Sequence, residues 1–337
     1  MTVHWGDVNA RARGLGSHLL PSETLASVTR LHTWEDMTRA LTSAGILPDE
    51  ATVGSPVEVE LALRRWAAGE IRVVRRWLGS RAAVLSVALD AEDRRSLRAL
   101  VRGAAAGVPA AVRLTGLLPT TALPERLLQE LAARDRIPDQ AALLVAAGHP
   151  VGPALLVAAA ATKPDLFAVE LAISRVFAES AARGARRDGR ALRTHVEAVI
   201  DAINCRSALL LAHGASAKSA VEAFIPGGRR LTLERFTAAA GAPDPFTGAR
   251  ILAAIDERSA EAWRDAADVA ALEAALEGAE DRRLEHLARM DPLGPAPTLL
   301  YLRRLGGQLV ALGEAVWSLD LGVAPPRSSR MAIGGVA

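Results

Sequence analysis

The chain has 337 residues, of which 50% are hydrophobic and 4% aromatic, so it can bury a large core or divide into two or three modules of ordinary domain size. Its 40 basic residues, with Lys163 and Lys218 the only lysines, nearly balance 38 acidic residues. This balance excludes a global electrostatic footprint for nucleic acid. The single cysteine, Cys205, excludes an intramolecular disulfide and a thiol-based metal cluster, and it fits a reducing, cytosolic compartment.

Ala, Leu and Val set among Arg and Glu dominate the sequence, and this mixture of strong helix formers predicts an all-α fold. The first residues lack the basic and apolar regions of a secretion signal. Short breaks containing Gly and Pro separate the predicted helices. These breaks lie at residues 45–56, 103–109, 119–124, 148–153, 226–228, 241–248 and 292–297.

Two stretches allow more than one structural interpretation. Residues 57–63 alternate as a strand does, but residues 64–70 do not, and an internal repeat described below favours helix. Residues 141–162 carry no charge and have the length of a membrane span, yet Gly148 and Pro150 interrupt them. We predict two buried helical segments joined by a turn.

A clear amphipathic pattern covers the region after residue 190. Its apolar residues fall on one stripe of a helix, whereas Arg193, Glu197, Asp201 and Asn204 lie off that stripe. We expect a helix that packs one face on a core. The stripe consists of Leu192, Val196, Val199, Ile200, Ile203, Leu210 and Leu211.

The chain contains an internal repeat. Residues 59–62, Val-Glu-Leu-Ala, recur as residues 169–172, and matches between residues 90–103 and 201–214 continue the register. The period, about 110 residues, exceeds that of short-repeat solenoids. It predicts three helical modules about a pseudo-threefold axis, spanning residues 1–89, 90–200 and 201–337, with the third copy more degraded.

A polar pattern recurs with the repeat: an Asp, then an Asn or Asp, then an Arg two residues later. The residues are Asp7, Asn9 and Arg11, then Asp90, Asp93 and Arg95, and then Asp201, Asn204 and Arg206. Asp201 and Arg206 point about 140° apart on a helix, so their partners must lie on other elements. We interpret all nine as polar clamps between helices or modules, with a contact to another protein of a complex as the alternative. Gly103 and Gly214 are predicted to end helices.

The sequence resembles a family of V-type ATPase components, which is designated C in archaeal and bacterial enzymes and d in eukaryotic ones. The opening residues 5–15 with Leu19-Leu20 resemble its aromatic, Asn-Ala-Arg-x-Arg, Leu-Leu start. Residues 90–103 and 201–214 are similar to its internal Asp-x-x-Asn/Asp helices, although Asp93 stands where Asn is more usual. Residues 224–228 resemble its proline-glycine turn, and residues 298–323 its closing segment.

The resemblance implies a funnel of three helical modules on the cytoplasmic face of the membrane, a peripheral part of the complex. It implies a non-catalytic rotor subunit without cofactor or small-molecule substrate. Its partners would be the central-shaft subunits and the membrane proteolipid ring.

Other interpretations stay open. His195, Glu197 and Cys205 lie close in sequence but lack the second cysteine of a zinc deaminase, and no lysine follows a glycine as a phosphate-binding loop requires. A basic cluster could meet phosphate or lipid head groups, although a solvated loop is the plainer interpretation. A helical adaptor unrelated to an ATPase is the alternative function. The basic cluster consists of Arg183, Arg186, Arg187, Arg190 and Arg193.

Overall fold

The computed structural model describes residues 5–48, 55–161, 163–186, 190–214, 219–253 and 268–323. All regular structure in these residues is helical, so the all-α prediction is confirmed. The chain forms two compact units. Unit 1 comprises residues 1–135 and 285–337, and unit 2 comprises residues 136–284.

Unit 1 combines the two ends of the chain. Its helices are α1 (Gly6–Gly16), α2 (Ser22–Val28), α3 (Trp34–Ser43), α4 (Pro56–Leu78), the 3₁₀ turn η1 (Gly79–Arg81), α5 (Ala82–Ala105), α6 (Ala110–Arg113), α7 (Glu125–Ala132) and α17 (Ala296–Leu321). The helix α16 (Val269–Met290) begins in unit 2 and ends in unit 1.

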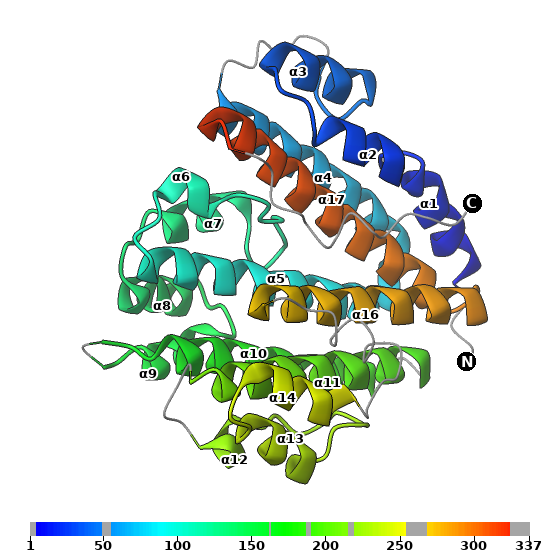
Figure 1. Ribbon diagram of the computed structural model, residues 1–337. Helices are drawn as coiled ribbons and strands as arrows, with labels where there is room; N and C mark the ends of the chain where they lie inside the picture. The colour runs from blue at the N-terminus through cyan, green and yellow to red at the C-terminus, as the bar shows by residue number, and fades with distance from the viewer. Residues whose placement is uncertain are drawn as a thin grey trace. The chain divides into compact units, whose positions relative to one another are not determined.

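The core of unit 1 forms around α17, which lies along α4 and also contacts α1 and α5 (Figure 1). This helix is apolar on nearly all sides, with Leu305, Leu309 and Leu312 fully buried, as expected of a helix covered by several neighbours. Residues 57–63 are helical and form the start of α4, where Ser55 accepts the Glu58 N–H as the N-cap.

Unit 2 is built on the pair α10 and α11. Its helices are α8 (Ile137–Ala146), α9 (Gly152–Ala158), α10 (Leu166–Ala185), α11 (Arg190–Ala212), α12 (Ala220–Ala223), α13 (Leu233–Ala240) and α14 (Pro245–Ala253). Both α13 and α14 pack on α11 (Figure 1). The Phe224 and Phe236 rings meet edge to face, with centroids 5.3 Å apart.

Residues 141–161 include the end of α8 and all of α9, joined by a turn in which Gly148 has φ +69°, and residue 162 lies outside the described residues. The predicted break is therefore confirmed, but the predicted burial is only partly correct. Leu144 and Leu155 are buried, whereas Val157 is 79% exposed. Among the described residues no helix is long and apolar enough to cross a membrane.

Helix α11 departs from the simple amphipathic prediction. Its apolar stripe is buried as expected, except that Leu210 and Leu211 are only partly covered, but Asp201 and Asn204, which lie off the stripe, are buried as well. The connection between α12 and α13 covers this second face and supplies their hydrogen-bond partners. The predicted module boundaries at residues 89/90 and 200/201 fall inside α5 and α11, so they do not coincide with breaks between helices.

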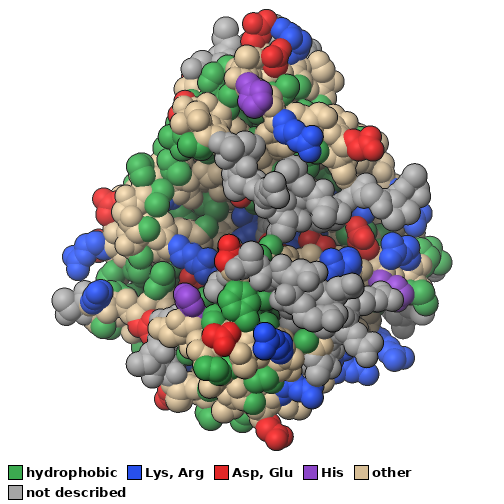
Figure 2. Space-filling view, viewed as in Figure 1, with side chains coloured by type: hydrophobic (Ala, Val, Ile, Leu, Met, Phe, Trp, Pro, Cys, Tyr) green, Lys and Arg blue, Asp and Glu red, His purple; other side chains and the backbone are tan. Residues whose placement is uncertain are grey.

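On the face drawn in Figure 2, acidic and basic side chains are interspersed, in keeping with the near balance of charge in the sequence.

Candidate functional site: polar tethers and a basic hollow

Asn9 ties the first helix to the segment before α17. Its side-chain amide donates to the carbonyls of Pro292 and Gly294, at 3.1 and 2.9 Å, and its oxygen accepts from the Thr298 hydroxyl at 2.9 Å. Asn9 is 2% exposed. A buried amide with three partners fixes one end of α1 against the start of α17.

The neighbours of Asn9 in the motif lie at the surface. Asp7 accepts two hydrogen bonds from Arg81, at 2.6 and 2.8 Å, which lower the pKa of this carboxyl to about 2. The Arg81 guanidinium also lies 5.7 Å from the Trp5 ring. Arg11 lies over the Trp77 ring at 5.5 Å. The Arg11–Trp77 pair joins α1 to the end of α4, and the Arg81–Trp5 pair joins η1 to the residue that precedes α1.

Asp93, on α5, is 5% exposed and accepts a hydrogen bond from the Thr120 hydroxyl at 2.5 Å. Burial raises the pKa of this carboxyl to about 7, against the effect of that hydrogen bond. Arg95 donates to Glu92 and to the carbonyl of Gly116. The motif therefore binds α5 to the connection between α6 and α7.

Asp90 lies on the same helix and is partly buried.

Asp201, on α11, binds a turn of backbone. Its carboxylate accepts the N–H groups of Arg229, Arg230 and Leu231 at 2.9 to 3.1 Å. The approach is close, because a Cβ at Gly228 would clash with the Asp201 carboxylate. Only glycine permits this turn to sit against the acid.

Asn204, one turn further along α11, binds the same connection. It accepts the Ile225 N–H at 2.9 Å and donates to the Ile225 carbonyl at 2.7 Å. The partners of Asp201 lie on another element, in keeping with the 140° separation between Asp201 and Arg206 on their helix. Arg206 lies further along α11 and is partly buried.

The two glycines differ in place. Gly214 follows the end of α11 with φ +76°. Gly103 lies inside α5, which continues to Ala105, and Gly107 has the positive φ instead. The space that Gly103 leaves is used by Arg113, because a Cβ there would lie 2.8 Å from Arg113 Cγ.

Unit 1 also contains a buried ionic network that the sequence patterns did not predict. Arg64, 2% exposed, donates two hydrogen bonds to Glu125, at 3.0 and 3.1 Å, and a third to the carbonyl of Leu114. Glu60 accepts the Gly116 N–H at 2.8 Å, and burial raises the pKa of this carboxyl to about 7. The recurrence of Val-Glu-Leu-Ala, which contains Glu60, at residues 169–172 was the sequence signal that could have marked this glutamate.

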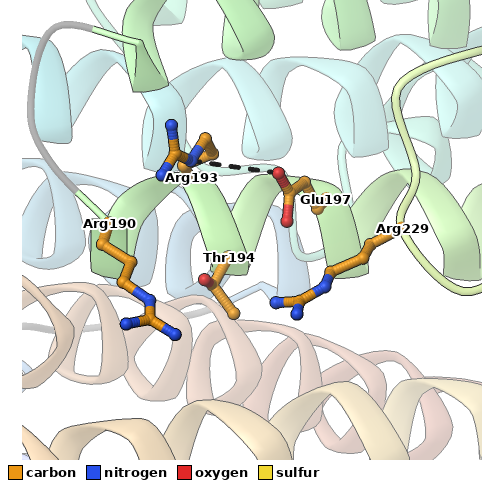
Figure 3. Close-up of a pocket in the computed structure, with 5 residues that line it drawn as sticks. All are labelled: Arg190, Arg193, Thr194, Glu197 and Arg229. Atoms are coloured by element: carbon orange, nitrogen blue, oxygen red, sulfur yellow. Dashed lines mark ion pairs between the residues drawn. The ribbon is translucent and has the colours of Figure 1, made fainter.

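The arginines of the predicted basic cluster do not lie at one site. Arg183 donates to the Glu179 carbonyl on α10, Arg186 follows that helix, and Arg187 lies outside the described residues. Arg190 and Arg193 line a hollow of about 470 Å³ together with three further side chains (Figure 3). The lining residues are Arg190, Arg193, Thr194, Glu197 and Arg229.

Cys205 is buried in unit 2, and burial raises the pKa of its thiol well above the usual value. Among the described residues, no three His, Cys, Asp or Glu side chains are grouped to hold a metal ion. The buried polar side chains of the motifs instead bind backbone and hydroxyl groups of nearby connections. The described residues thus define a class of protein, an all-helical protein in which buried polar side chains tie helices to the connections between other helices.

Comparison with known proteins makes the assignment specific. The family model described as "ATP synthase (C/AC39) subunit" matches residues 8–305. The C subunit of the V-type ATP synthase from each of two strains of Thermus thermophilus is 31% identical to the chain over 227 residues. The match spans 65% of this chain and 65% of each relative's length. The chain belongs to the ATP synthase (C/AC39) subunit family.

Proposed function

We propose that this chain is the non-catalytic central-stalk subunit of a V-type ATPase or ATP synthase, joining the rotating shaft to the membrane proteolipid ring on its cytoplasmic face. The observation that carries the proposal is the family match, which covers residues 8–305. The name shared by the two Thermus relatives, which are C subunits of V-type ATP synthases, supports the same role. A part that transmits torque needs rigidity and shape complementarity rather than a reactive side chain.

The buried polar contacts of Asn9, Asp93, Asp201 and Asn204, which we call tethers, support this role physically. Each one satisfies buried polar groups across separate elements, and the one at Asn9 reaches Pro292 and Gly294 near the other end of the chain. Buried networks with all their partners rigidify a structure, because breaking them leaves unpaired groups in a low-dielectric interior. Such a scaffold is suited to bearing a load.

We also propose that the chain is built from repeated modules. The helices α4 and α10 begin at Pro56 and Leu166, and the short helices α6 and α12 begin at Ala110 and Ala220, so both pairs start 110 residues apart. Asp93 and Asn204, matched by the repeat, each bind the connection that follows the short helix. A pseudo-threefold funnel remains the predicted arrangement.

The third module, on this proposal, combines the two ends of the chain. Helix α17 packs on α1, as α4 contacts α5 and α10 contacts α11. Asn9 then takes the place that Asp93 and Asn204 hold in the other copies, and it binds the segment before α17. This pairing explains why the polar motif recurs at residue 7, within the first helix.

Affinity purification tests the proposal. The tagged full-length chain is expressed in its native host, membranes are solubilised gently, and co-purifying proteins are identified by mass spectrometry. We expect the catalytic subunits, the shaft subunits and a small proteolipid. The untagged strain, processed in parallel, serves as the control.

A second measurement tests coupling rather than presence. In membranes from a strain lacking the chain, we expect residual ATP hydrolysis to become insensitive to a carbodiimide that modifies the ring carboxylate, and plasmid-borne wild-type chain to restore sensitivity. Recovery of an unrelated soluble partner alone, with unchanged carbodiimide sensitivity, would establish the adaptor alternative instead.

A further inference from the structure

The hollow beside the first turns of α11 is distinctive in its charge. Arg190, Thr194 and Glu197 recur at three- and four-residue intervals, so they share one face of the helix, with Arg193 beside them. Arg229 enters from the connection before α13. Three arginines against one glutamate leave the lining with a net positive charge.

The arginines differ in their existing partners. Arg193 lies 4.0 Å from Glu197, as the dashed line in Figure 3 shows. Figure 3 also shows the Arg229 side chain reaching along α11 toward Thr194, with Arg190 on the other side of that threonine. Two guanidinium groups and a hydroxyl therefore border the same open space.

The backbone of Arg229 is held in place by Asp201. Asp201, one helical turn beyond Glu197, accepts the Arg229 N–H at 3.1 Å and the next two N–H groups as well. The close contact at Gly228 fits this turn against the carboxylate. Asp201 therefore fixes the point from which Arg229 extends, and three N–H donors offset its own negative charge.

We propose that this hollow binds a phosphate-containing anion, either a free phosphate compound or a phospholipid head group. Guanidinium groups form paired hydrogen bonds with phosphate oxygens, and a threonine hydroxyl adds a further donor. The volume, about 470 Å³, has room for a phosphate, a diphosphate or a head group. Glu197 lies 4.0 Å from Arg193 and can accept a hydrogen bond from a ligand hydroxyl. The site is independent of the proposed stalk function.

Binding of pyrophosphate to the purified full-length chain, measured by titration calorimetry at low ionic strength, tests the proposal. We expect saturable binding that falls by about tenfold or more in the double variant Arg190→Gln/Arg229→Gln, because two charged donor groups are lost. Arg190→Lys/Arg229→Lys should bind with intermediate affinity, since lysine keeps the charge but not the planar fork.

A matched control removes the same charge elsewhere in unit 2. Arg183 and Arg235 are exposed and lie outside the hollow, so Arg183→Gln/Arg235→Gln should change pyrophosphate affinity less than about twofold. Circular dichroism melting of each variant establishes that it is folded.

Vesicle flotation distinguishes the two sources of phosphate. The chain is mixed with phosphatidylcholine vesicles with or without phosphatidic acid, using the same variants. Binding of phosphatidic acid vesicles alone, with the same loss in Arg190→Gln/Arg229→Gln, supports the head group, and binding of pyrophosphate supports a free compound. No binding in either assay, an equal loss in the control variant, or displacement of pyrophosphate by polyglutamate at equal charge concentration would overturn the proposal.

Discussion

Asp93 is a buried carboxyl that accepts a hydrogen bond from a threonine hydroxyl, and its pKa is raised from 3.8 to about 7 by burial. A carboxyl with a raised folded-state pKa holds its proton in the native state at pH values where the unfolded chain has lost it. Its contribution to stability is therefore complete below about pH 4 and is lost as the pH rises to about 7.

Asp93→Asn removes this titration while keeping an oxygen that can accept from Thr120. We expect the variant to be more stable than wild type at pH 8, by about 1 to 3 kcal/mol, and to be no more stable at pH 4. Urea unfolding at five pH values between 4 and 8 measures the difference. The free energy of unfolding of the variant should still fall with rising pH, because Glu60, whose pKa is also about 7, still titrates. Asp320→Asn, at an exposed aspartate of α17, is the control and should leave the profile unchanged.

Asp201 acts differently, because its carboxylate accepts three backbone N–H groups. Asp201→Ala should lower the free energy of unfolding by about 1 to 3 kcal/mol, since the turn at residues 229–231 loses its acceptors. Asp201→Asn keeps one oxygen acceptor and should cost less. The measurement is urea unfolding combined with hydrogen exchange of the three N–H groups. Unchanged exchange at this turn in Asp201→Ala would show that the carboxylate does not hold it.

At the scale of elements, α17 packs against buried acidic side chains at positions where it has glycine. Gly306 faces Glu92 and Gly313 faces Glu60. A Cβ at Gly313 would lie 2.8 Å from Glu60 Oε2 and 3.1 Å from the Gly116 backbone nitrogen. Backbone atoms cannot yield as the end of a flexible side chain can. At Gly313, α17 therefore lies closely against Glu60 of α4 and against the connection between α6 and α7, and glycine leaves room for both.

Gly313→Ala should consequently destabilise the protein by about 1 to 3 kcal/mol, although alanine favours helix more than glycine does. Gly69→Ala, in the middle of α4, is the matched control: its Cβ would meet nothing within 4 Å, so we expect stabilisation by about 0.5 to 1 kcal/mol. Urea unfolding of the two variants compares them directly. A stability gain of similar size in both would contradict the close packing.

Patterns within one helix were predictable, and contacts between distant segments were not. The apolar stripe of α11 follows from spacing, as do the breaks around α8 and α9. The repeat marked Asn204 as a polar clamp, but its partner could not be predicted, because Ile225 lies 21 residues away on a connection whose path no local pattern encodes. For the same reason Arg229 carried no signal of its own, while the repeat marked Asp201, which holds it.

At the scale of the whole chain, its two ends belong to one compact unit, although α1 and α17 are separated by most of the sequence. The three predicted consecutive modules place residues 285–337 in one module with residues 201–284. The order of the sequence does not indicate that residues 285–337 pack with residues 1–135. Asn9 supplies the physical link, through hydrogen bonds that span 283 to 289 residues.

A pair of asparagine variants tests whether each tether acts within its own unit. Asn9→Ala should speed hydrogen exchange about 10- to 100-fold in α1 and at the start of α17, because the carbonyls of Pro292 and Gly294 and the Thr298 hydroxyl lose their partner. Asn204→Ala is the matched change in unit 2 and should speed exchange in residues 224–231 instead. Hydrogen-exchange mass spectrometry of the full-length chain reads both regions in one experiment. If either variant loosened both units equally, the tethers would be parts of one cooperative network, and the separation into units would have no energetic counterpart.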